Sequence, residues 1–175
     1  EVSKKPSINS RQAVVMDRNS KSILYGKNEN VKTKMASTTK IMTAMVVLQN
    51  TNLENTVEVS KKAALTGGSR LGLKEGDKIT VRDLLYGLLL RSGNDAAVAL
   101  AEYVGGSIEG FAKLMNENTI GLGLKNTHFV TPHGLDQEEH YTTAYELAII
   151  ADYALKNKTF AQIVNTKNCT IHINN

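Results

Sequence analysis

Apolar and polar residues follow one another in a pattern that predicts an extended start, a helical middle and an extended end. Residues 12–17 and 22–25 are largely apolar runs of strand length on either side of the polar residues 18–21. This arrangement predicts a β-hairpin with a turn at the polar residues. Residues 41–48 form another largely apolar run, which we expect to be a buried helix that begins near Thr38.

Most of the remaining helices are predicted in the middle of the chain. Thr80, followed three residues later by Asp83, resembles a capping box and opens the strongly apolar run 84–90. Other helices, each opened by a polar capping residue, are expected at 60–65, 94–104, 107–120, 142–155 and 159–164. We expect a short strand at residues 56–59, and the alternating stretch 169–173 predicts a strand that is cut short.

These elements predict a fold of the mixed α/β (α+β) class, in which an antiparallel sheet accompanies a large helical subdomain. We expect residues 1–50 and 168–175 to form a partial, sheet-containing subdomain together with the helix that begins near Thr38. Residues 51–167 are expected to form an all-helical subdomain. One hairpin and one terminal strand are too few to cover that helix, so the sheet is expected to be incomplete in this chain.

Composition and charge exclude several classes of protein. Of the 175 residues, 41% are hydrophobic and 22% are charged, which is typical of a globular domain with a core. Runs such as 84–90 are far too short to cross a bilayer. The net charge of +4 is mild and no basic-aromatic cluster accompanies it, so nucleic-acid binding is not predicted. Cys169 is the only cysteine, and the four histidines lack the spacing of metal ligands, so we expect neither a disulfide nor a metal site.

Candidate chemistry lies at the start of the helix predicted behind Thr38. Ser37 and Lys40 are three residues apart, which places both side chains on one helix face. Burial and the positive end of the helix both favour a neutral amine on Lys40. A neutral amine could take the proton from Ser37 as the serine attacks a carbonyl, with the Ser37 main-chain N–H as a candidate oxyanion donor. The spacing alone is weak evidence, because it occurs by chance on many helix surfaces.

A second candidate cluster lies in residues 91–95, between two predicted helices. Ser92 could pass a proton between a lysine and a leaving amine. Asn94 offers both a donor and an acceptor to a peptide-like substrate. The alternative interpretation is structural, because Ser-Gly-Asn is also typical of turns and helix N-caps.

Taken together, the two clusters resemble a known family. Residues 36–43, ASTTKIMT, and 84–97, LLYGLLLRSGNDAA, are similar to the D-alanyl-D-alanine carboxypeptidases. These are low-molecular-mass penicillin-binding proteins with a serine β-lactamase/transpeptidase-like fold, and they share the Ser-x-x-Lys and Ser-x-Asn motifs. The stretches 67–69, 72–74 and 127–135 fit the same family. The resemblance runs from about Ala13 to the end of the chain.

The resemblance implies a role for each candidate residue. Ser37 would be the acylated nucleophile, Lys40 its base, Ser92 a proton relay and Asn94 a partner of the substrate amide. The implied substrate is a peptidoglycan stem peptide ending in D-Ala-D-Ala, which loses its terminal D-alanine through an acyl-enzyme. β-lactam antibiotics would acylate the same serine, and neither a cofactor nor a metal is implied. The reaction would take place outside the cytoplasm of a bacterium, in a secreted, periplasmic or surface-bound enzyme.

The chain departs from the family pattern in two ways. The third motif of the family, Lys-Thr-Gly, is absent. In the family, the strand that carries it binds the substrate carboxylate and supplies the other oxyanion donor. We therefore expect this chain to be the N-terminal portion of a longer enzyme and to be nearly inactive alone. Peripheral membrane association through a missing C-terminal region stays open. Met35 replaces a frequent proline, which should alter only the loop.

Two alternative functions remain open at this stage. One is a serine β-lactamase, although the Glu-x-x-Leu-Asn stretch typical of the class A enzymes is absent. The other is a non-catalytic fragment that binds penicillin or peptidoglycan. Turnover of nitrocefin by the completed chain distinguishes the β-lactamase, since a carboxypeptidase should be acylated and released slowly. Labelling by a fluorescent penicillin distinguishes the non-catalytic fragment, because a chain without a working Ser37–Lys40 pair would stay unlabelled.

Overall fold

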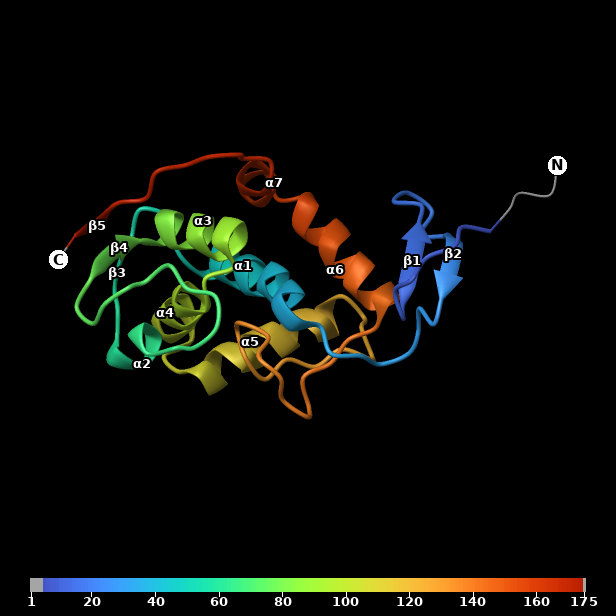
Figure 1. Ribbon diagram of the computed structural model, residues 1–175, viewed down its shortest axis with the longest axis horizontal. Coiled ribbons are helices and arrows are strands. Elements are labelled where there is room, and N and C mark those ends of the chain that lie inside the picture. The colour runs from blue at the N-terminus through green and yellow to red at the C-terminus, as the bar shows by residue number, and fades with distance from the viewer. Residues whose placement is uncertain (1–4, 175) are drawn as a thin grey trace.

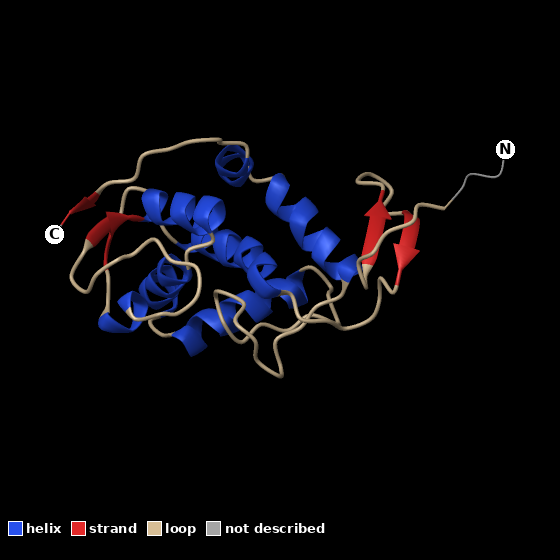
Figure 2. Cartoon of the chain, viewed as in Figure 1, coloured by secondary structure: helices blue, strands red, loops and turns tan. Residues whose placement is uncertain are grey.

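The computed structural model describes residues 5–174. Its helices form a central body, and its strands lie at opposite ends of the molecule (Figures 1 and 2). Near the N-terminus, β1 (Ala13–Met16) and β2 (Ile23–Lys27) pair antiparallel in a two-stranded sheet, with Ala13 opposite Lys27. The predicted hairpin is therefore confirmed.

All the predicted helices are present. A short 3-10 turn, η1 (Ala36–Thr38), leads directly into the helix behind it. The helices are α1 (Thr39–Asn50), α2 (Lys61–Ala64), α3 (Val81–Arg91), α4 (Asn94–Gly105), α5 (Ile108–Gly121), α6 (Ala144–Leu155) and α7 (Lys158–Val164). The predicted cap at Thr80 is formed, since its hydroxyl accepts a hydrogen bond of 3.1 Å from the Asp83 main-chain N–H.

Helix α1 lies at the centre of the helical body, in contact with α3, α4, α5 and α6 (Figure 1). From Thr39 to Val47 its side chains are buried, apart from the partly buried Ile41. A helix that is apolar on nearly every side must be covered all round, and the neighbouring helices provide that cover with Leu84, Leu88, Leu100, Phe111 and Ile150. This packing holds the start of α1 in a fixed position.

The hairpin is attached to the helical body through Asp152 of α6. The Asp152 carboxylate is 7% exposed and accepts hydrogen bonds from Lys21 Nζ and from Arg18 Nε, the latter at 2.7 Å. Both cations lie in the turn between β1 and β2. These bonds from Lys21 and Arg18 hold the pKa of Asp152 well below its usual range. Charge-assisted bonds of this kind fix the hairpin beside α6.

The terminal strand does not pair with the hairpin, contrary to expectation. Instead, β5 (Ile173–Asn174) pairs with β4 (Lys78–Thr80), which also pairs with β3 (Thr56–Glu58) in a three-stranded antiparallel sheet. After α7 the chain runs back along α3, where the His172 main-chain N–H donates to Asp83 Oδ2 at 3.0 Å. This path ends at the free edge of β4, while the hairpin lies at the other end of the molecule (Figure 1).

The expected grouping of residues therefore needs correction. Residues 168–174 share a sheet with β3 and β4, so they do not extend the hairpin sheet. The block 51–167 is not all-helical either, because it contributes two of the strands in that sheet. Residue 175 lies outside the described residues. The division of the chain into two subdomains stays a prediction.

Candidate active site

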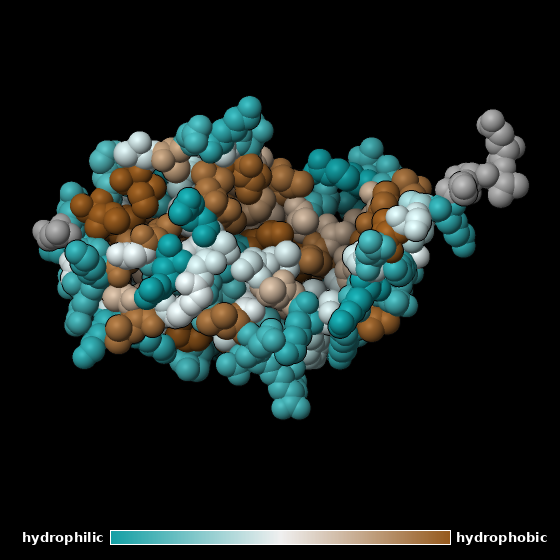
Figure 3. Space-filling view, in the orientation of Figure 1, coloured by the Kyte–Doolittle hydropathy of each residue, from teal (hydrophilic) through white to brown (hydrophobic). Residues whose placement is uncertain are grey.

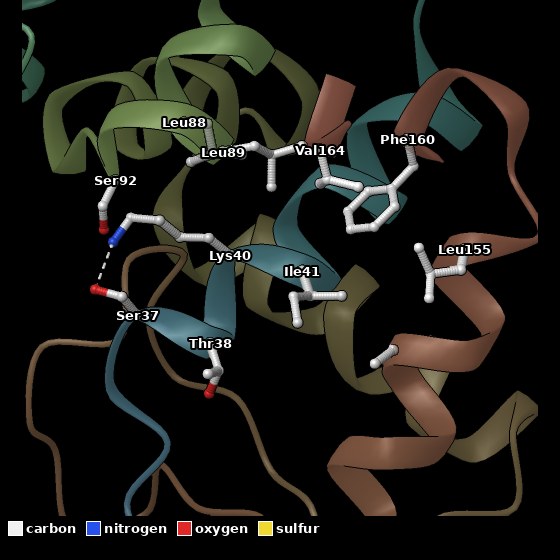
Figure 4. Close-up of a pocket in the computed structure, with 11 residues that line it drawn as sticks. Ser37, Thr38, Lys40, Ile41, Leu88, Leu89, Ser92, Leu155, Phe160 and Val164 are labelled. Carbon is white, nitrogen blue, oxygen red and sulfur yellow. Dashed lines mark hydrogen bonds between the residues drawn. The ribbon is translucent and has the colours of Figure 1, made fainter. Parts of the chain in front are cut away.

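The structure brings Ser37 and Lys40 together, as their spacing predicts. Ser37 lies in η1 and is exposed, and Lys40 lies in the first turn of α1 and is only 3% exposed. Lys40 Nζ is 3.2 Å from Ser37 Oγ, and the dashed line in Figure 4 marks this contact. Lys40 Nζ also donates a hydrogen bond of 2.9 Å to the main-chain oxygen of His133. The amine is therefore held by a hydroxyl on one side and a carbonyl on the other.

The surroundings of Lys40 disfavour its charged form. Both of its hydrogen-bond partners are uncharged, and burial lowers the pKa of Lys40 from 10.5 to about 8. Burial acts in this direction because it removes water that would solvate an ammonium group. A sizeable fraction of Lys40 is therefore neutral near pH 8, and a neutral amine beside a hydroxyl can act as its base.

Ser92 joins this pair from a different element. It ends α3 in a left-handed conformation, with φ of 54° and ψ of 36°. Its hydroxyl oxygen is buried and has no hydrogen-bond partner among the residues that the structure describes. In Figure 4 this hydroxyl points toward the side chains of Lys40 and Ser37. A strained backbone and an unpaired buried hydroxyl at one residue are typical of a functional site.

Asn94 is placed differently from the other three candidates. It opens α4 and is buried, and its side-chain Nδ2 donates a 2.8 Å hydrogen bond to the main-chain oxygen of Gly67. Its main-chain N–H also donates to Ser69 O at 2.7 Å. Both donors thus hold the loop at residues 67–69. Asn94 does not line the cavity that opens beside Ser37, which is described below.

The next residue, Asp95, extends this attachment. Its carboxylate is fully buried and accepts hydrogen bonds from the main-chain N–H groups of Leu71, Gly72 and Leu73 at 2.9 to 3.1 Å. Asp95 thereby anchors the loop at residues 71–73 to the start of α4. Together, Asn94 and Asp95 hold the loop at residues 67–73 against the start of α4, which follows Ser92 in the chain.

Sequence reasoning assigned no role in the site to one segment, residues 131–134, which contacts α1. Besides the bond from Lys40 to His133, the hydroxyl of Thr43 donates a 2.6 Å hydrogen bond to Pro132 O. Gly134, with φ of 86°, packs so closely that a Cβ there would lie 1.8 Å from Ala36 O. The Thr-Pro-His-Gly turn and the family resemblance of residues 127–135 were the available signals, but neither predicts these bonds, because main-chain acceptors leave no mark on the sequence.

A cavity of about 460 Å³ opens beside Lys40 and Ser37. Apart from the polar groups at one end, most of its lining is apolar, and it comes from four helices: Ile41 of α1, Leu88 and Leu89 of α3, Ala151 and Leu155 of α6, and Phe160 and Val164 of α7. Figure 3 shows apolar side chains gathered around α7 and the adjoining part of α6. A mainly apolar cavity with convergent polar groups at one end is the usual form of a ligand site.

The described part of the chain holds no cluster of potential metal ligands. Within residues 5–174, no three histidine, cysteine, aspartate or glutamate side chains lie close enough to hold a metal ion. The groups that meet at the site are two hydroxyls and an amine, contributed by Ser37, Ser92 and Lys40 (Figure 4).

Comparison with known proteins gives the same family along the whole chain. The family model described as D-alanyl-D-alanine carboxypeptidase, peptidase S11, matches residues 1–175. The chain is 40% identical over 161 residues to D-alanyl-D-alanine carboxypeptidase DacF of Bacillus subtilis, covering 89% of the chain and 41% of that relative. It is 39% identical over 175 residues to the D-alanyl-D-alanine carboxypeptidase of Streptomyces sp. strain K15, covering 93% of the chain and 60% of that relative. The chain thus spans less than two thirds of the length of each of these relatives.

Solved structures agree with these sequences. The Streptomyces K15 DD-transpeptidase superposes with a TM-score of 0.89 at 40% identity, covering 94% of this chain and 67% of that one. Penicillin-binding protein 5 of Haemophilus influenzae superposes with a TM-score of 0.90 at 34% identity, covering 95% of this chain and 51% of that one. The predicted fold class is confirmed by these similarities. Since the family model matches its full length, the chain belongs to the D-alanyl-D-alanine carboxypeptidase family of serine peptidases.

Proposed function

We propose that this chain carries the acylation machinery of a serine-type D-Ala-D-Ala carboxypeptidase that acts on peptidoglycan stem peptides. The observation that carries the proposal is the meeting of Ser37, Lys40 and Ser92 at one end of the cavity, with Lys40 Nζ 3.2 Å from Ser37 Oγ. Ser37 is the nucleophile, Lys40 the general base and Ser92 the proton relay. The names of the relatives support the substrate class, because they are D-alanyl-D-alanine carboxypeptidases.

In the first step, neutral Lys40 accepts the proton of the Ser37 hydroxyl while Ser37 Oγ bonds to the carbonyl carbon of the penultimate D-alanine. The negative charge moves to the carbonyl oxygen, for which the Ser37 main-chain N–H is the candidate donor. The bond to the terminal D-alanine then breaks. The proton passes from Lys40 through the Ser92 hydroxyl to the departing amine, which leaves an ester on Ser37.

In the second step, water hydrolyses this ester. Lys40 takes a proton from the attacking water, and that proton returns to Ser37 Oγ as the ester bond breaks. A β-lactam opens in the same way as the peptide bond, but its amine stays attached to the acyl group. The antibiotic therefore remains on Ser37 after acylation.

Asn94 is proposed to orient the substrate amide through its Oδ1, because its Nδ2 already donates a hydrogen bond to Gly67 O.

The activity of these residues by themselves is proposed to be low. The Lys-Thr-Gly motif is not among the 175 residues, and in the resembled family the strand that carries it binds the substrate carboxylate.

Peptidoglycan lies outside the cytoplasm, so we propose an extracytoplasmic location in a bacterium. Within residues 5–174, no helix combines the length and apolarity that crossing a membrane requires. Peripheral membrane association through a further region of the whole protein stays a proposal.

A fluorescent penicillin tests the nucleophile. The chain is expected to become covalently labelled at Ser37, slowly and with negligible release, and Ser37→Ala is expected to abolish the label. The exposed Ser7→Ala variant, which makes the same chemical change away from the cavity, should label like the parent chain. Labelling that survives in Ser37→Ala would refute the assignment. Rapid hydrolysis of nitrocefin would favour a β-lactamase, and rapid turnover of a D-Ala-D-Ala peptide would contradict low activity of the chain alone.

The pH dependence of labelling tests the base. Because the neutral amine is the active form, the labelling rate should rise with pH and level off above about pH 8. Lys40→Arg should lower the rate by about 10²–10⁴-fold at all pH values, because the guanidinium stays charged. Rate constants measured from pH 6 to pH 10 check both expectations. A rate that is flat across this range in the parent chain would rule out Lys40 as the base.

Ser92 should show opposite effects on stability and on reactivity. Ser92→Gly removes a left-handed non-glycine residue and a buried unpaired hydroxyl, so it should raise the free energy of unfolding by about 1 kcal/mol. The same variant should release D-alanine from a peptide more slowly than the parent, because the relay is gone. Urea denaturation and a sensitive single-turnover assay measure the two effects. A destabilised variant with unchanged release would contradict both the strain and the role.

A further inference from the structure

His140 is a buried histidine that the proposed chemistry leaves unused. It is 2% exposed and lies between α1 and the segment at residues 130–134. Its Nδ1 accepts a 2.9 Å hydrogen bond from the Val130 main-chain N–H, and its Nε2 is 2.7 Å from the hydroxyl oxygen of Thr39. The ring also packs edge-on against the buried Phe129, with the ring centroids 5.6 Å apart.

These contacts determine the protonation state of the ring. A main-chain N–H can only donate, so Nδ1 must be the unprotonated nitrogen. The single ring proton is then on Nε2, which donates to Thr39 Oγ1. A second proton on Nδ1 would face the Val130 N–H and break that bond. His140 is therefore a neutral imidazole that accepts on one side and donates on the other.

The two hydrogen-bond partners of His140, Thr39 and Val130, lie in the same two segments as the two partners of Lys40. Thr39 directly precedes Lys40 and lies two residues after Ser37. Val130 begins the segment whose His133 oxygen accepts the hydrogen bond from Lys40. The Thr43–Pro132 bond of 2.6 Å holds the same segment against α1 one turn further along. His140 thus joins the element that carries Ser37 and Lys40 to the segment that holds Lys40 from the other side.

We propose that His140 is a positioning residue for Lys40, which as a neutral Nε2–H imidazole fixes the nucleophile helix against residues 130–134. The proposal rests on the proposed function, because positioning matters only if Lys40 acts on Ser37. Loss of either bond of His140 lets the segment move relative to α1. Lys40 then loses a fixed carbonyl partner and becomes more accessible to water, so its amine is less often neutral and less often aimed at Ser37.

The charged groups around the ring permit this role. His133 of the same segment and Lys40 of α1 lie nearby, His128 lies on the preceding extended stretch, and Asp136 lies on the loop that follows. Burial, and next the neighbouring His128, lower the pKa of His140 to about 4, and Asp136 opposes them. Since His140 is neutral well below the working range of Lys40, its contacts persist wherever Lys40 can act as a base.

Nitrogen-15 NMR of the parent chain tests the tautomer without any activity. The ring of His140 should show a protonated Nε2 and an unprotonated Nδ1 from pH 6 to pH 9. A protonated Nδ1 in this range would overturn the proposal, because the Val130 bond could not then exist. This result would leave the assignment of Ser37 as the nucleophile untouched.

Two matched variants test the positioning effect. The amide oxygen of His140→Asn can replace Nδ1 as acceptor, and the amide nitrogen of His140→Gln can replace Nε2 as donor, so each variant retains one of the two bonds. We expect each to lower the rate of penicillin labelling at pH 7 by at least about tenfold per folded molecule, and to move the midpoint of its pH profile above that of the parent. His172→Asn makes the same change at an exposed site and should match the parent.

The outcomes separate this proposal from the proposed function. Suppose that the parent chain labels through Ser37, and that the His140 variants are less stable but keep the parent's pH midpoint and its labelling rate per folded molecule. His140 would then serve stability alone. That result would overturn the positioning role. A shifted midpoint in both variants, together with a parent-like His172→Asn, supports it. Failure of the parent chain itself to label would count against the proposed function.

Discussion

The burial of a single amine, that of Lys40, is the constraint on which the site depends. An ammonium group loses the free energy of hydration when it is buried, and here its partners are uncharged, the Ser37 hydroxyl and the His133 carbonyl. The penalty falls on the charged form of the side chain, which is why its pKa drops to about 8. Burial without a counter-charge is costly for stability, yet it is also the condition that makes a lysine useful as a base.

The fold keeps this amine in place with pieces that are far apart in sequence. Helix α1 supplies Lys40 and is covered on nearly all sides, so it cannot shift easily. The end of α3 contributes Ser92 in a left-handed conformation, and Gly134 lets its turn approach the main chain of Ala36 at a distance no side chain would permit. The left-handed conformation of Ser92 is strained, and strain of this kind persists only where well-packed elements surround it. The helical body therefore supplies the rigidity, and the turns supply the reacting and holding groups.

Local patterns in the sequence predict much of this arrangement. The hairpin, the helices and the cap at Thr80 follow from periodicity and capping residues, because those features depend on neighbours along the chain. The Ser37–Lys40 contact follows from helix geometry, since it joins residues three apart. A proton-passing role for Ser92 was suggested by its residue type, but its pairing with Ser37 and Lys40 came from the family resemblance.

Other features could not be predicted, because they join distant residues through groups that carry no sequence signal. Lys40 and the His133 carbonyl are 93 residues apart, and Thr39 and His140 are 101 apart. The partner of the terminal strand was predicted wrongly, since a two-residue strand pairs with whichever free edge its connection reaches. Asn94 appears as a side chain facing substrate in the family motif, but its amide nitrogen is committed to Gly67.

A direct titration of Lys40 is the sharpest test of the central claim. Lysine labelled with carbon-13 at Cε would be followed by NMR from pH 6 to pH 12, with Lys40→Arg used to assign the signal. The structure predicts a midpoint near 8 for Lys40, well below the ordinary lysine value of 10.5. A midpoint near the ordinary lysine value of 10.5 would mean that the amine stays charged beside Ser37, and the account of the site would fail.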